Sequence, residues 1–343
     1  MHNDLYIETH VLPSPLTKLT KSYQQEFGSR SEVPCQLESH QVPRISIVTP
    51  SYMQGAFIES TIRSVLLQGY PNLQFIVMDG GSTDDTLAIL NHYDRWISSW
   101  TSAPDGGQSQ AINQGIEKSD GDFVGWLCSD DLLTSGALVN MGRYLVEHPS
   151  CQWISGAGRF VSLAEGDQEI FEAGIQSETS LLEYWLYGFK GHFLPQPSTL
   201  WTRSLWERAG GLRESNRWSM DYELWLRFEE LADLDVLPGI LSVSQLHEFC
   251  KSESGRHEQR LEMMQCAHAA AERRGLGEDW LSRHLLKKWL IRWRAARARR
   301  ALLSGEPAGL FQELFQLLRS PWYIRTEEGR LSALGWDLGA RDS

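Results

Sequence analysis

The sequence predicts an α/β fold, in which a mostly parallel sheet is flanked by helices and followed by a helical region. From about residue 44 to residue 130, short apolar runs alternate with segments whose apolar residues recur at helical spacing. That alternation is typical of a parallel sheet covered on both faces. Polar or glycine-rich motifs follow directly after the predicted strands. The carboxyl ends of parallel strands meet at one edge, where open α/β proteins bind ligands.

The first strand is predicted at residues 45–49, where Ile-Ser-Ile-Val-Thr is rich in β-branched residues. A turn is expected over Pro50, Ser51 and Tyr52. The apolar residues that follow share one face of a predicted helix, at Ile58, Ile62, Val65 and Leu66.

The second strand is predicted at residues 73–78 and ends at the motif Asp79-Gly-Gly-Ser-Thr-Asp84. Ser82 or Thr83 is expected to cap the next helix, which runs through residues 87–90, because a hydroxyl at that place accepts a free backbone N–H bond.

A third strand is predicted at residues 97–102, followed by a helix through residues 111–116 and a fourth strand at 123–127. Beyond residue 150 the pattern is looser. The elements predicted there are strands at 151–161, 168–173 and 236–243 and helices at 221–231, 256–274, 279–303 and 308–318.

Three regions are expected along the chain. Residues 1–43 are polar and proline-containing, which indicates an amino-terminal extension. Residues 44–255 carry the alternating strand and helix pattern and form the predicted α/β domain. Residues 256–343 are predicted to be a helical carboxy-terminal region.

The composition argues against some classes of partner and indicates a cellular compartment. A net charge of −12 argues against a nucleic-acid partner, because neutralising phosphates requires clustered Lys and Arg. The five cysteines show no CxxC pairing, which suits reduced thiols better than a disulfide framework. Neither a secretory signal nor an apolar run of about 18 residues is found. We therefore expect the chain to act in the cytoplasm.

Two adjacent acids, Asp130 and Asp131, end the apolar run that begins at Phe123. Neighbouring carboxylates repel each other, so a divalent cation that carries a phosphorylated ligand would compensate them. The alternative is structural, because an Asp at a helix start accepts backbone N–H bonds, and Asp130 could be such a cap. The residues alone leave both interpretations open.

The glycine motifs of two other nucleotide-binding classes are missing from the sequence. No G-x-G-x-x-G follows the first strand, and no G-x-x-x-x-G-K-[ST] occurs, so nicotinamide-cofactor binding and P-loop hydrolysis lose their signatures. After the second strand, Asp79 is placed to accept hydrogen bonds from a ligand such as a nucleobase edge. Its structural alternative is an Asx turn before Gly80 and Gly81.

Five motifs occur in order along the chain: Thr49-Pro-Ser-Tyr52, Asp79-Gly-Gly-Ser-Thr-Asp84, Asp105-Gly-Gly-Gln-Ser-Gln-Ala-Ile-Asn113, Trp126-Leu-Cys-Ser-Asp-Asp131 and Met220-Asp-Tyr-Glu-Leu-Trp225. Together they resemble the family 2 glycosyltransferases of GT-A fold, which are inverting enzymes that use nucleotide-sugars. The resemblance covers roughly residues 44–255 and implies that this region is a GT-A catalytic domain.

The resemblance implies a nucleotide-sugar site at the carboxyl ends of the strands. Asp79 resembles the family carboxylate that binds the nucleobase, and Pro50, Ser51 and Tyr52 line the same pocket in that reading. The full set of residues implied in nucleotide-sugar binding is Thr49, Pro50, Ser51, Tyr52, Asp79, Asp105, Gln108, Asn113 and Asp130.

The resemblance also implies a divalent metal, Mn²⁺ or Mg²⁺. Asp131 resembles the metal-ligating acid of the family's D-x-D-like motif, whereas Asp130 is expected to face the ribose or support the metal. His247 matches a His that approaches the metal or diphosphate in related enzymes, although a hydrogen-bonded structural His is the alternative. Ser129 replaces the first acid, and Cys128 stands where Asn is common, so free metal is expected to bind weakly.

Asp221 matches the family's catalytic base. It lies at the start of a predicted helix, where the helix dipole favours the ionised carboxylate. Such a carboxylate can remove the proton of the acceptor hydroxyl, and one direct displacement inverts the anomeric centre. The alternatives are that Asp221 is a plain helix cap and that Glu223 is the base.

The segment 184–225 is rich in aromatic residues, which either line the acceptor site against sugar rings or belong to the core. Ser198 lies in a segment that matches one near the acceptor in the family. Residues 283–300 carry Lys and Arg but no acid, with Trp289 and Trp293 on one helix face. This helix either lies on an anionic membrane or packs on the catalytic domain.

The sequence thus predicts an inverting, metal-dependent glycosyltransferase of hexosyltransferase type, with UDP-sugar as the expected donor. The acceptor is expected to be a glycan or lipid-linked hydroxyl in the synthesis of a cell-surface or secreted polysaccharide, in the cytoplasm or at the inner face of the membrane. The incomplete D-x-D leaves an alternative, a non-catalytic sugar-nucleotide-binding or assembly protein of the same fold. A nucleotidyltransferase would need a basic glycine-rich loop, and residues 49–54 offer no basic residue.

Overall fold

The computed structural model describes residues 39–162, 168–169, 181–183, 194–247, 250–251 and 255–276. Within these, one compact unit contains residues 39–169, 194–215 and 231–251, and a second contains residues 181–183, 216–230 and 255–276. The amino-terminal extension up to residue 38, Trp185, the helices predicted at 279–303 and 308–318 and the basic segment 283–300 lie outside the described residues. No described helix is long and apolar enough to cross a membrane.

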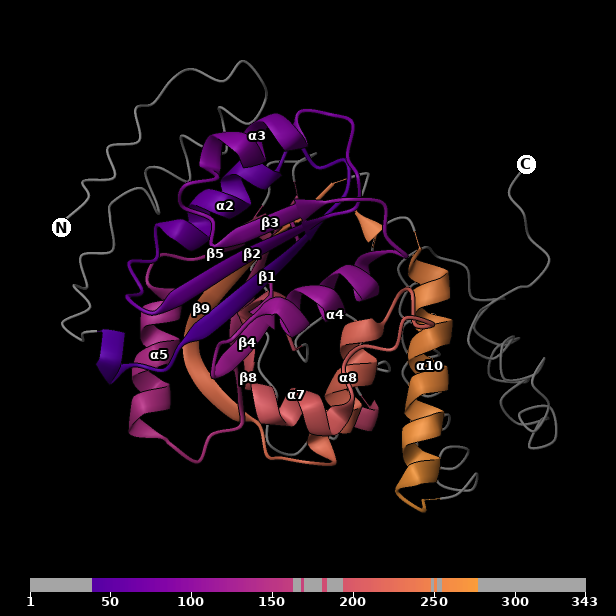
Figure 1. The fold of residues 1–343 in the computed structure, drawn as a ribbon. Helices are drawn as coiled ribbons and strands as arrows, with labels where there is room; N and C mark the ends of the chain where they lie inside the picture. Colours follow the sequence, from indigo (N-terminus) through magenta and orange to yellow (C-terminus); the bar gives the residue numbers. More distant parts are fainter. Residues whose placement is uncertain are drawn as a thin grey trace, which may run out of the picture. The chain divides into compact units, whose positions relative to one another are not determined.

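The first unit is built on one mixed sheet, shown in Figure 1, that has nine strands among the described residues. The strand order is β3-β2-β1-β4-β8-β6-β9-β5, with β7 paired to β6. The predicted parallel part is confirmed, because β1 lies parallel to β2 and β4, and β2 lies parallel to β3. The bounds are β1 Ile45–Ser51, β2 Leu73–Asp79, β3 Ser99–Ser102, β4 Phe123–Trp126, β5 Asp131–Leu133, β6 Trp153–Ser162, β7 Gln168–Glu169, β8 Thr199–Thr202 and β9 Asp235–Leu246.

Helices cover both faces of the parallel strands (Figure 1). Val48 of β1 lies against α4, whereas the neighbouring Ile47 packs in the cluster that includes Ile58 and Ile62 of α2. Side chains alternate between the two faces of a strand, so α4 and α2 lie on opposite faces. The helices of this unit are α2 Ile58–Leu66, α3 Thr86–Tyr93, α4 Gln108–Lys118, α5 Ala137–Glu147 and α7 Arg203–Ala209, with 3-10 turns at Ser39–Gln41 and Gln196–Ser198.

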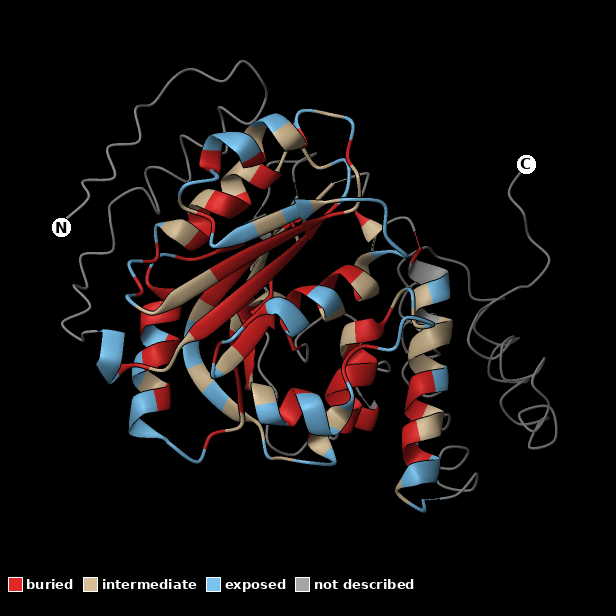
Figure 2. Cartoon of the chain, in the orientation of Figure 1, coloured by how far each residue is buried: buried red, intermediate tan, exposed pale blue. Residues whose placement is uncertain are grey.

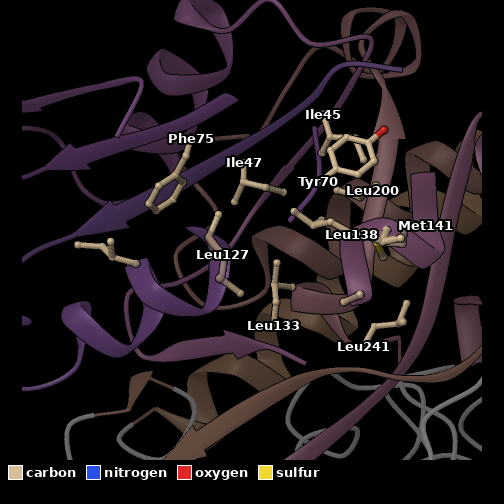
Figure 3. Packing of buried hydrophobic residues seen from close by; sticks show 14 of the residues in the cluster. Ile45, Ile47, Tyr70, Phe75, Leu127, Leu133, Leu138, Met141, Leu200 and Leu241 are labelled. Atoms are coloured by element: carbon tan, nitrogen blue, oxygen red, sulfur yellow. The ribbon is translucent and has the colours of Figure 1, made fainter. Parts of the chain in front are cut away.

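The core lies between the sheet and the helices α2, α3 and α5. All seven residues of β1 are buried, as the unbroken red of this strand in Figure 2 shows. In Figure 3, Phe75 and Ile47 point from the strands towards Leu127 and Leu133, with Leu138 of α5 beside them. Burial of such side chains stabilises a fold by about 1.5–3 kcal/mol each. This buried cluster therefore supports the loops that follow the strands.

α4 approaches β1 closely because it presents Gly115. A Cβ atom on this glycine would lie 2.4 Å from Cγ1 of Val48 and 3.0 Å from Cγ of Met78. No larger residue fits there without displacing the strand, so the glycine sets the distance between helix and sheet.

β1 is longer than predicted. It continues through Pro50 to Ser51, where a turn was expected. Proline lacks an N–H and is normally confined to strand positions that need no hydrogen bond on one side. β4 pairs with β1 only as far as Val48, so beyond that residue β1 has β2 as its one neighbour and tolerates Pro50.

The predicted cap of the second helix is wrong. α3 begins at Thr86 with Asp85 at its N-cap position, and no side chain makes the capping bond. The Ser82 hydroxyl instead donates to Oδ1 of Asp79 at 2.5 Å and accepts from the N–H of Met53 at 2.7 Å. Ser82 therefore ties the end of β2 to the loop that follows β1.

Four elements of this unit have no counterpart in the sequence prediction: β5, α5, β8 and α7. β5 has only three residues, and its partner is β9, to which it pairs through Asp131 opposite Ser244. A three-residue strand leaves no periodic pattern, so only its distant partner reveals it.

The second unit is described by itself and contains η2 Leu181–Glu183, α8 Met220–Glu229 and α10 Arg256–Arg273. The Tyr222 hydroxyl donates to the carbonyl of Leu181 at 2.8 Å and joins α8 to η2. The carboxylate of Glu262 on α10 accepts the N–H groups of Trp218 and Ser219 at 3.0 and 3.2 Å. α10 thus satisfies backbone donors at the start of α8, a role that side-chain caps fill in other helices.

Candidate functional site

Asp79 closes β2 with a carboxylate that organises the loop after it. Oδ2 accepts the N–H groups of Gly81 and Ser82 at 3.2 and 2.9 Å and the hydroxyl of Ser102 at 2.6 Å, and Oδ1 accepts the Ser82 hydroxyl. The Asx turn is therefore present. Because a carboxylate offers about four acceptor positions and Oδ1 receives one described bond, Oδ1 can still accept an N–H from a ligand.

Two buried hydroxyls lie on the same strand face as Asp79. Ser51 is directly opposite Asp79 in the register of β1 and β2, and Thr49 precedes it by two residues. Thr49 and Ser51 are 0% and 6% exposed, and within the described part of the chain neither hydroxyl has a hydrogen-bond partner. A buried hydroxyl without a partner costs about 1–3 kcal/mol, which a polar ligand would offset.

Tyr52, Gly80 and Asp105 bring the ends of three strands together. A Cβ atom on Gly80 would lie 3.3 Å from the Tyr52 ring and 3.2 Å from Oδ2 of Asp105, so the glycine lets these side chains approach. Tyr52 is 64% exposed, which leaves its ring face open to a stacking partner. Asp105 accepts the N–H of Gly107 at 2.8 Å and so braces the start of α4.

Asp130 lies in the turn after β4, and Asp131 is the first residue of β5. The sequence predicted that both acids follow the strand that begins at Phe123, but not that Asp131 starts another strand. The hydroxyl of Thr61 on α2 donates to the carbonyls of Ser129 and Asp131, both at 2.8 Å. Thr61 is buried, so this pair of bonds fixes the turn to the core. Neither acid caps a helix, and the cap interpretation of Asp130 is therefore wrong.

Asp131 holds its proton more tightly than an ordinary carboxyl. Burial raises its pKa well above the usual value, and the neighbouring charge of Asp130 raises it further, while hydrogen bonds with Ser244 and Cys128 lower it in part. A cation that binds between the two adjacent carboxylates would favour the ionised form of both.

His247 lies beside the acid pair at the end of β9. Its Nε2 is 3.1 Å from Oδ2 of Asp130, and its ring stacks on Phe57 with centroids 4.2 Å apart and planes 16° apart. The amide of Gln245 donates to the carbonyl of Asp130 at 2.7 Å. The backbone of Asp130 and the imidazole of His247 are therefore held in place, whichever of the two roles predicted for His247 applies.

Gln108 and Asn113, both on α4, differ in what they contact. The Gln108 amide donates to Sγ of Cys128 at 3.2 Å and accepts from the ammonium of Lys251 at 3.0 Å, which links α4 to the acid turn. The side-chain amide of Asn113 donates to the carbonyl of Leu212 and accepts the N–H of the same residue, each at 2.9 Å. That contact supports a positioning role for Asn113, and its binding of a nucleotide-sugar stays a prediction.

The donor atoms fit a divalent cation. One ligand atom each from Cys128, Asp130 and Asp131 lie within 4.8 Å of one another, and so do ligand atoms of Asp130, His247 and Cys250. Carboxylate oxygens suit Mn²⁺ and Mg²⁺. Sequence reasoning missed Cys250, Thr61 and Phe57. Only the His-x-x-Cys spacing of the first was visible in the chain.

The predicted base lies in the second unit. Asp221 is half-buried in the first turn of α8, and its Oδ1 accepts the N–H of Tyr222 at 2.8 Å. The N-cap position belongs to Ser219, so Asp221 is not the plain cap. Glu223 is buried and paired with Arg227 at 2.6 Å. This pair weakens the case for Glu223 as the base, because a buried, paired carboxylate is not available to a substrate.

Most of the described aromatic residues belong to the core. Trp201, Trp206 and Trp225 are buried, and the rings of Trp201 and Trp206 stack with centroids 5.9 Å apart. Ser198 is also buried and bonds the carbonyl of Ala157 and the hydroxyl of Ser242. These residues therefore do not form an acceptor wall, and Ser198 supports β6 and β9.

Known proteins share both the sequence pattern and the fold. Residues 46–189 match the family model "Glycosyl transferase family 2". A Campylobacter jejuni GalNAc(5)-diNAcBac-PP-undecaprenol beta-1,3-glucosyltransferase is 26% identical over 164 residues, which are 44% of this chain and 50% of that protein. The chain spans 37 to 44% of the length of three further curated relatives that it matches.

Two solved structures are similar to the structure of this chain. S. aureus TarS 1-349 in complex with UDP-GlcNAc has a TM-score of 0.55 and 19% identity, and the match covers 66% of each chain. The mannosyltransferase PcManGT from Pyrobaculum calidifontis, in complex with GDP-Man and Mn²⁺, has a TM-score of 0.52 and 16% identity over 94% of this chain and 93% of that one. At these identities the likeness establishes the GT-A fold. The family match covers residues 46–189, less than half of the chain, and shows that this part is similar to the family 2 glycosyltransferases.

Proposed function

We propose that the chain is an inverting glycosyltransferase that moves a sugar from a nucleotide-sugar, with a UDP-sugar as the expected donor, to an acceptor hydroxyl. The observation that carries the proposal is the meeting of two polar clusters at one sheet edge. The first contains Thr49, Ser51 and Asp79 at the ends of β1 and β2, and the second contains Asp130 and Asp131 after β4. These strands are parallel, so their carboxyl ends lie at the same edge of the sheet and would face one ligand.

Each cluster suits one part of a nucleotide-sugar. Asp79 would accept the N–H of the nucleobase, and Tyr52 would stack on the base. A divalent cation, Mn²⁺ or Mg²⁺, would offset the charge of the departing diphosphate when bound. Asp131 would hold that cation, with Asp130 oriented by its contact with His247 at 3.1 Å. The ligands named for the TarS and PcManGT structures, UDP-GlcNAc and GDP-Man with Mn²⁺, support this assignment.

We assign the base to Asp221, which would take the proton of the acceptor hydroxyl during a single displacement. Its place in the first turn of α8 favours the ionised form, because the helix amino terminus carries partial positive charge. The pairing of Glu223 with Arg227 supports Asp221 over its rival. The anomeric configuration of the first product, read by proton NMR before mutarotation, tests inversion; a product of retained configuration would overturn it.

The acceptor is proposed to be a lipid-linked or other glycan, in the synthesis of a cell-surface or secreted polysaccharide. The name of the Campylobacter relative, which includes an undecaprenol diphosphate, supports a lipid-linked acceptor. We further propose cytoplasmic action, at the inner membrane face if residues 283–300 bind lipid. Co-sedimentation with anionic vesicles, compared with a Trp289→Ala/Trp293→Ala variant, tests that contact, and no binding by the wild type would exclude it.

A thermal-shift panel tests donor binding. UDP, GDP, dTDP and CMP are each added with and without Mn²⁺, because a ligand that binds the folded state raises the melting temperature by mass action. We expect a shift with UDP that grows with Mn²⁺. A larger shift with another nucleotide would reassign the donor base. No shift with any of the four, together with no donor turnover, would favour the non-catalytic alternative.

A further inference from the structure

Met53, in the segment between β1 and α2, has an unusual backbone conformation. Its φ of 56° lies in the left-handed region, and among the residues that the structure describes it is the one residue other than glycine with a positive φ. This conformation brings Cβ of an L-residue close to the following carbonyl oxygen, so a side chain as bulky as that of Met adopts it at a cost in free energy. Strained residues of this kind cluster where ligands bind.

The hydrogen bond of the Met53 backbone does not explain why this residue is a Met. The N–H of Met53 donates to the Ser82 hydroxyl at 2.7 Å, and this hydroxyl donates to Oδ1 of Asp79 at 2.5 Å. Glycine or asparagine would make the same backbone bond with less strain, because both occupy the left-handed region more readily. The reason for a Met at this position therefore lies in its side chain.

The Met53 side chain gains little from its contacts within the chain. Its Sδ accepts the N–H and the hydroxyl of Thr83 at 3.4 and 3.5 Å, and a thioether sulfur is a weak acceptor. Met53 is also 47% exposed, so burial of the side chain offsets little of the backbone strain. The thioether is therefore accessible to a ligand.

Two exposed neighbours, Tyr52 and Met53, border the loop that Asp79 organises. The Tyr52 ring lies 3.3 Å from the position of a Cβ atom on Gly80, and the thioether lies against Thr83. Thioethers make favourable contacts with aromatic rings. We propose that Met53 is a nucleobase-binding residue, whose thioether contacts the base that reaches Asp79, and that this contact offsets the backbone strain. The inference rests on the function proposed above and adds a binding residue to it.

Peroxide footprinting of the full-length protein tests the contact without a substitution. Hydrogen peroxide converts an accessible thioether to its sulfoxide, and mass spectrometry of peptides gives the rate at each Met. The nucleotide with the largest thermal shift in the panel above, expected to be UDP, should slow the oxidation of Met53 relative to that of Met264, which is half-buried on α10. An unchanged ratio of the two rates at saturating nucleotide would overturn the proposal.

Met53→Asn separates binding from folding. Because Asn tolerates the left-handed region, this variant should melt at or above the wild-type temperature, whereas loss of the thioether should weaken nucleotide binding about two- to tenfold in calorimetric titration. Leu67→Asn is the matched control, because Leu67 is similarly exposed, at 46%, but lies between the end of α2 and the start of β2. Its nucleotide affinity should equal that of the wild type.

Three results of the titration have distinct meanings. Wild-type affinity in Met53→Asn would overturn the proposal. A loss of affinity that is accompanied by a lower melting temperature, and that Met53→Gly reproduces, would assign Met53 a structural role and overturn it as well. If the wild type binds none of the four nucleotides, the proposed donor site fails and this inference fails with it, whereas nucleotide binding that leaves Met53 unprotected contradicts this inference alone.

Discussion

At the scale of single residues, the two adjacent acids occupy different environments. Asp130 contacts His247 at 3.1 Å, whereas Asp131 starts β5 and is held by Ser244 and Cys128. Burial raises the pKa of Asp131 well above its usual value, and the charge of Asp130 adds to that rise. Binding of a cation at this pair would therefore displace a proton from Asp131.

This pair predicts a pH dependence of metal binding. A carboxyl with a raised pKa is protonated at a higher pH than an ordinary Asp, and the proton must leave before Mn²⁺ binds. Lowering the pH through the raised pKa of Asp131 should therefore weaken Mn²⁺ binding, and Mn²⁺ should release a proton. Calorimetry in buffers of different ionisation enthalpy measures both effects. A Mn²⁺ affinity that stays constant as the pH is lowered would contradict the role of Asp131 as a metal ligand.

Asp221→Asn tests the proposed base. The amide is nearly isosteric with the carboxylate but cannot take a proton, and general bases typically contribute about 10²- to 10⁴-fold to a rate. We expect transfer to fall by that factor while nucleotide binding persists. Glu214→Gln is the control, because Glu214 is an exposed carboxylate of the preceding loop. Transfer by Asp221→Asn within about tenfold of the wild-type rate, or about 1.4 kcal/mol of barrier, would refute the role.

At the scale of elements, α10 supports the start of α8 through one carboxylate. Glu262 accepts the N–H groups of Arg217, Trp218 and Ser219 and the hydroxyl of Ser219, at 3.0 to 3.2 Å. These donors lie just before Asp221, so Glu262 is a positioning residue for the proposed base.

Glu262→Ala should lower the free energy of unfolding by about 1–3 kcal/mol, because it removes charged acceptors from several backbone donors at once. Urea unfolding measures this loss. Glu258→Ala, an exposed acid in the first turn of the same helix, should stay within about 0.5 kcal/mol of the wild type. Equal effects of the two substitutions would mean that Glu262 is only a surface charge.

The contact between α4 and β1 should not tolerate a side chain larger than that of Gly115. Gly115→Val would force side-chain atoms into Val48, whose Cγ1 lies 2.4 Å from the first atom that a substitution adds. We expect a loss of about 1–3 kcal/mol in the free energy of unfolding. Gln114→Ala changes the exposed neighbour on the same helix and should be nearly neutral. A neutral Gly115→Val would show that α4 moves freely on the sheet.

At the scale of the whole molecule, the sequence anticipated one half of the sheet better than the other. β1, β2 and β4 are predictable because each is an apolar run, and β1, β2 and β3 are each followed by a helix of their own. β5 and β8 are not, because β5 pairs with β9, and β8 pairs with β4 and β6, all distant in the chain. Short elements fixed by distant pairing carry no local signal.

The candidate site divides in the same way. Asp79, Asp130 and Asp131 were identifiable because they follow predicted strands directly. The contribution of Thr61, which fixes the acid turn from α2, depends on a tertiary contact between residues 68 to 70 positions apart. Such a contact is invisible in the chain, as was the stacking of Phe57 on His247.

The most direct test is calorimetric titration of the nucleotide selected by the thermal-shift panel, with and without Mn²⁺, into the wild type and Asp131→Asn. We expect Mn²⁺ to tighten binding to the wild type by at least about tenfold, or about 1.4 kcal/mol. In Asp131→Asn this gain should vanish, while metal-free binding through Asp79 and its neighbours remains. An undiminished Mn²⁺ effect in the variant, or no nucleotide binding to the wild type, would contradict the metal role of Asp131.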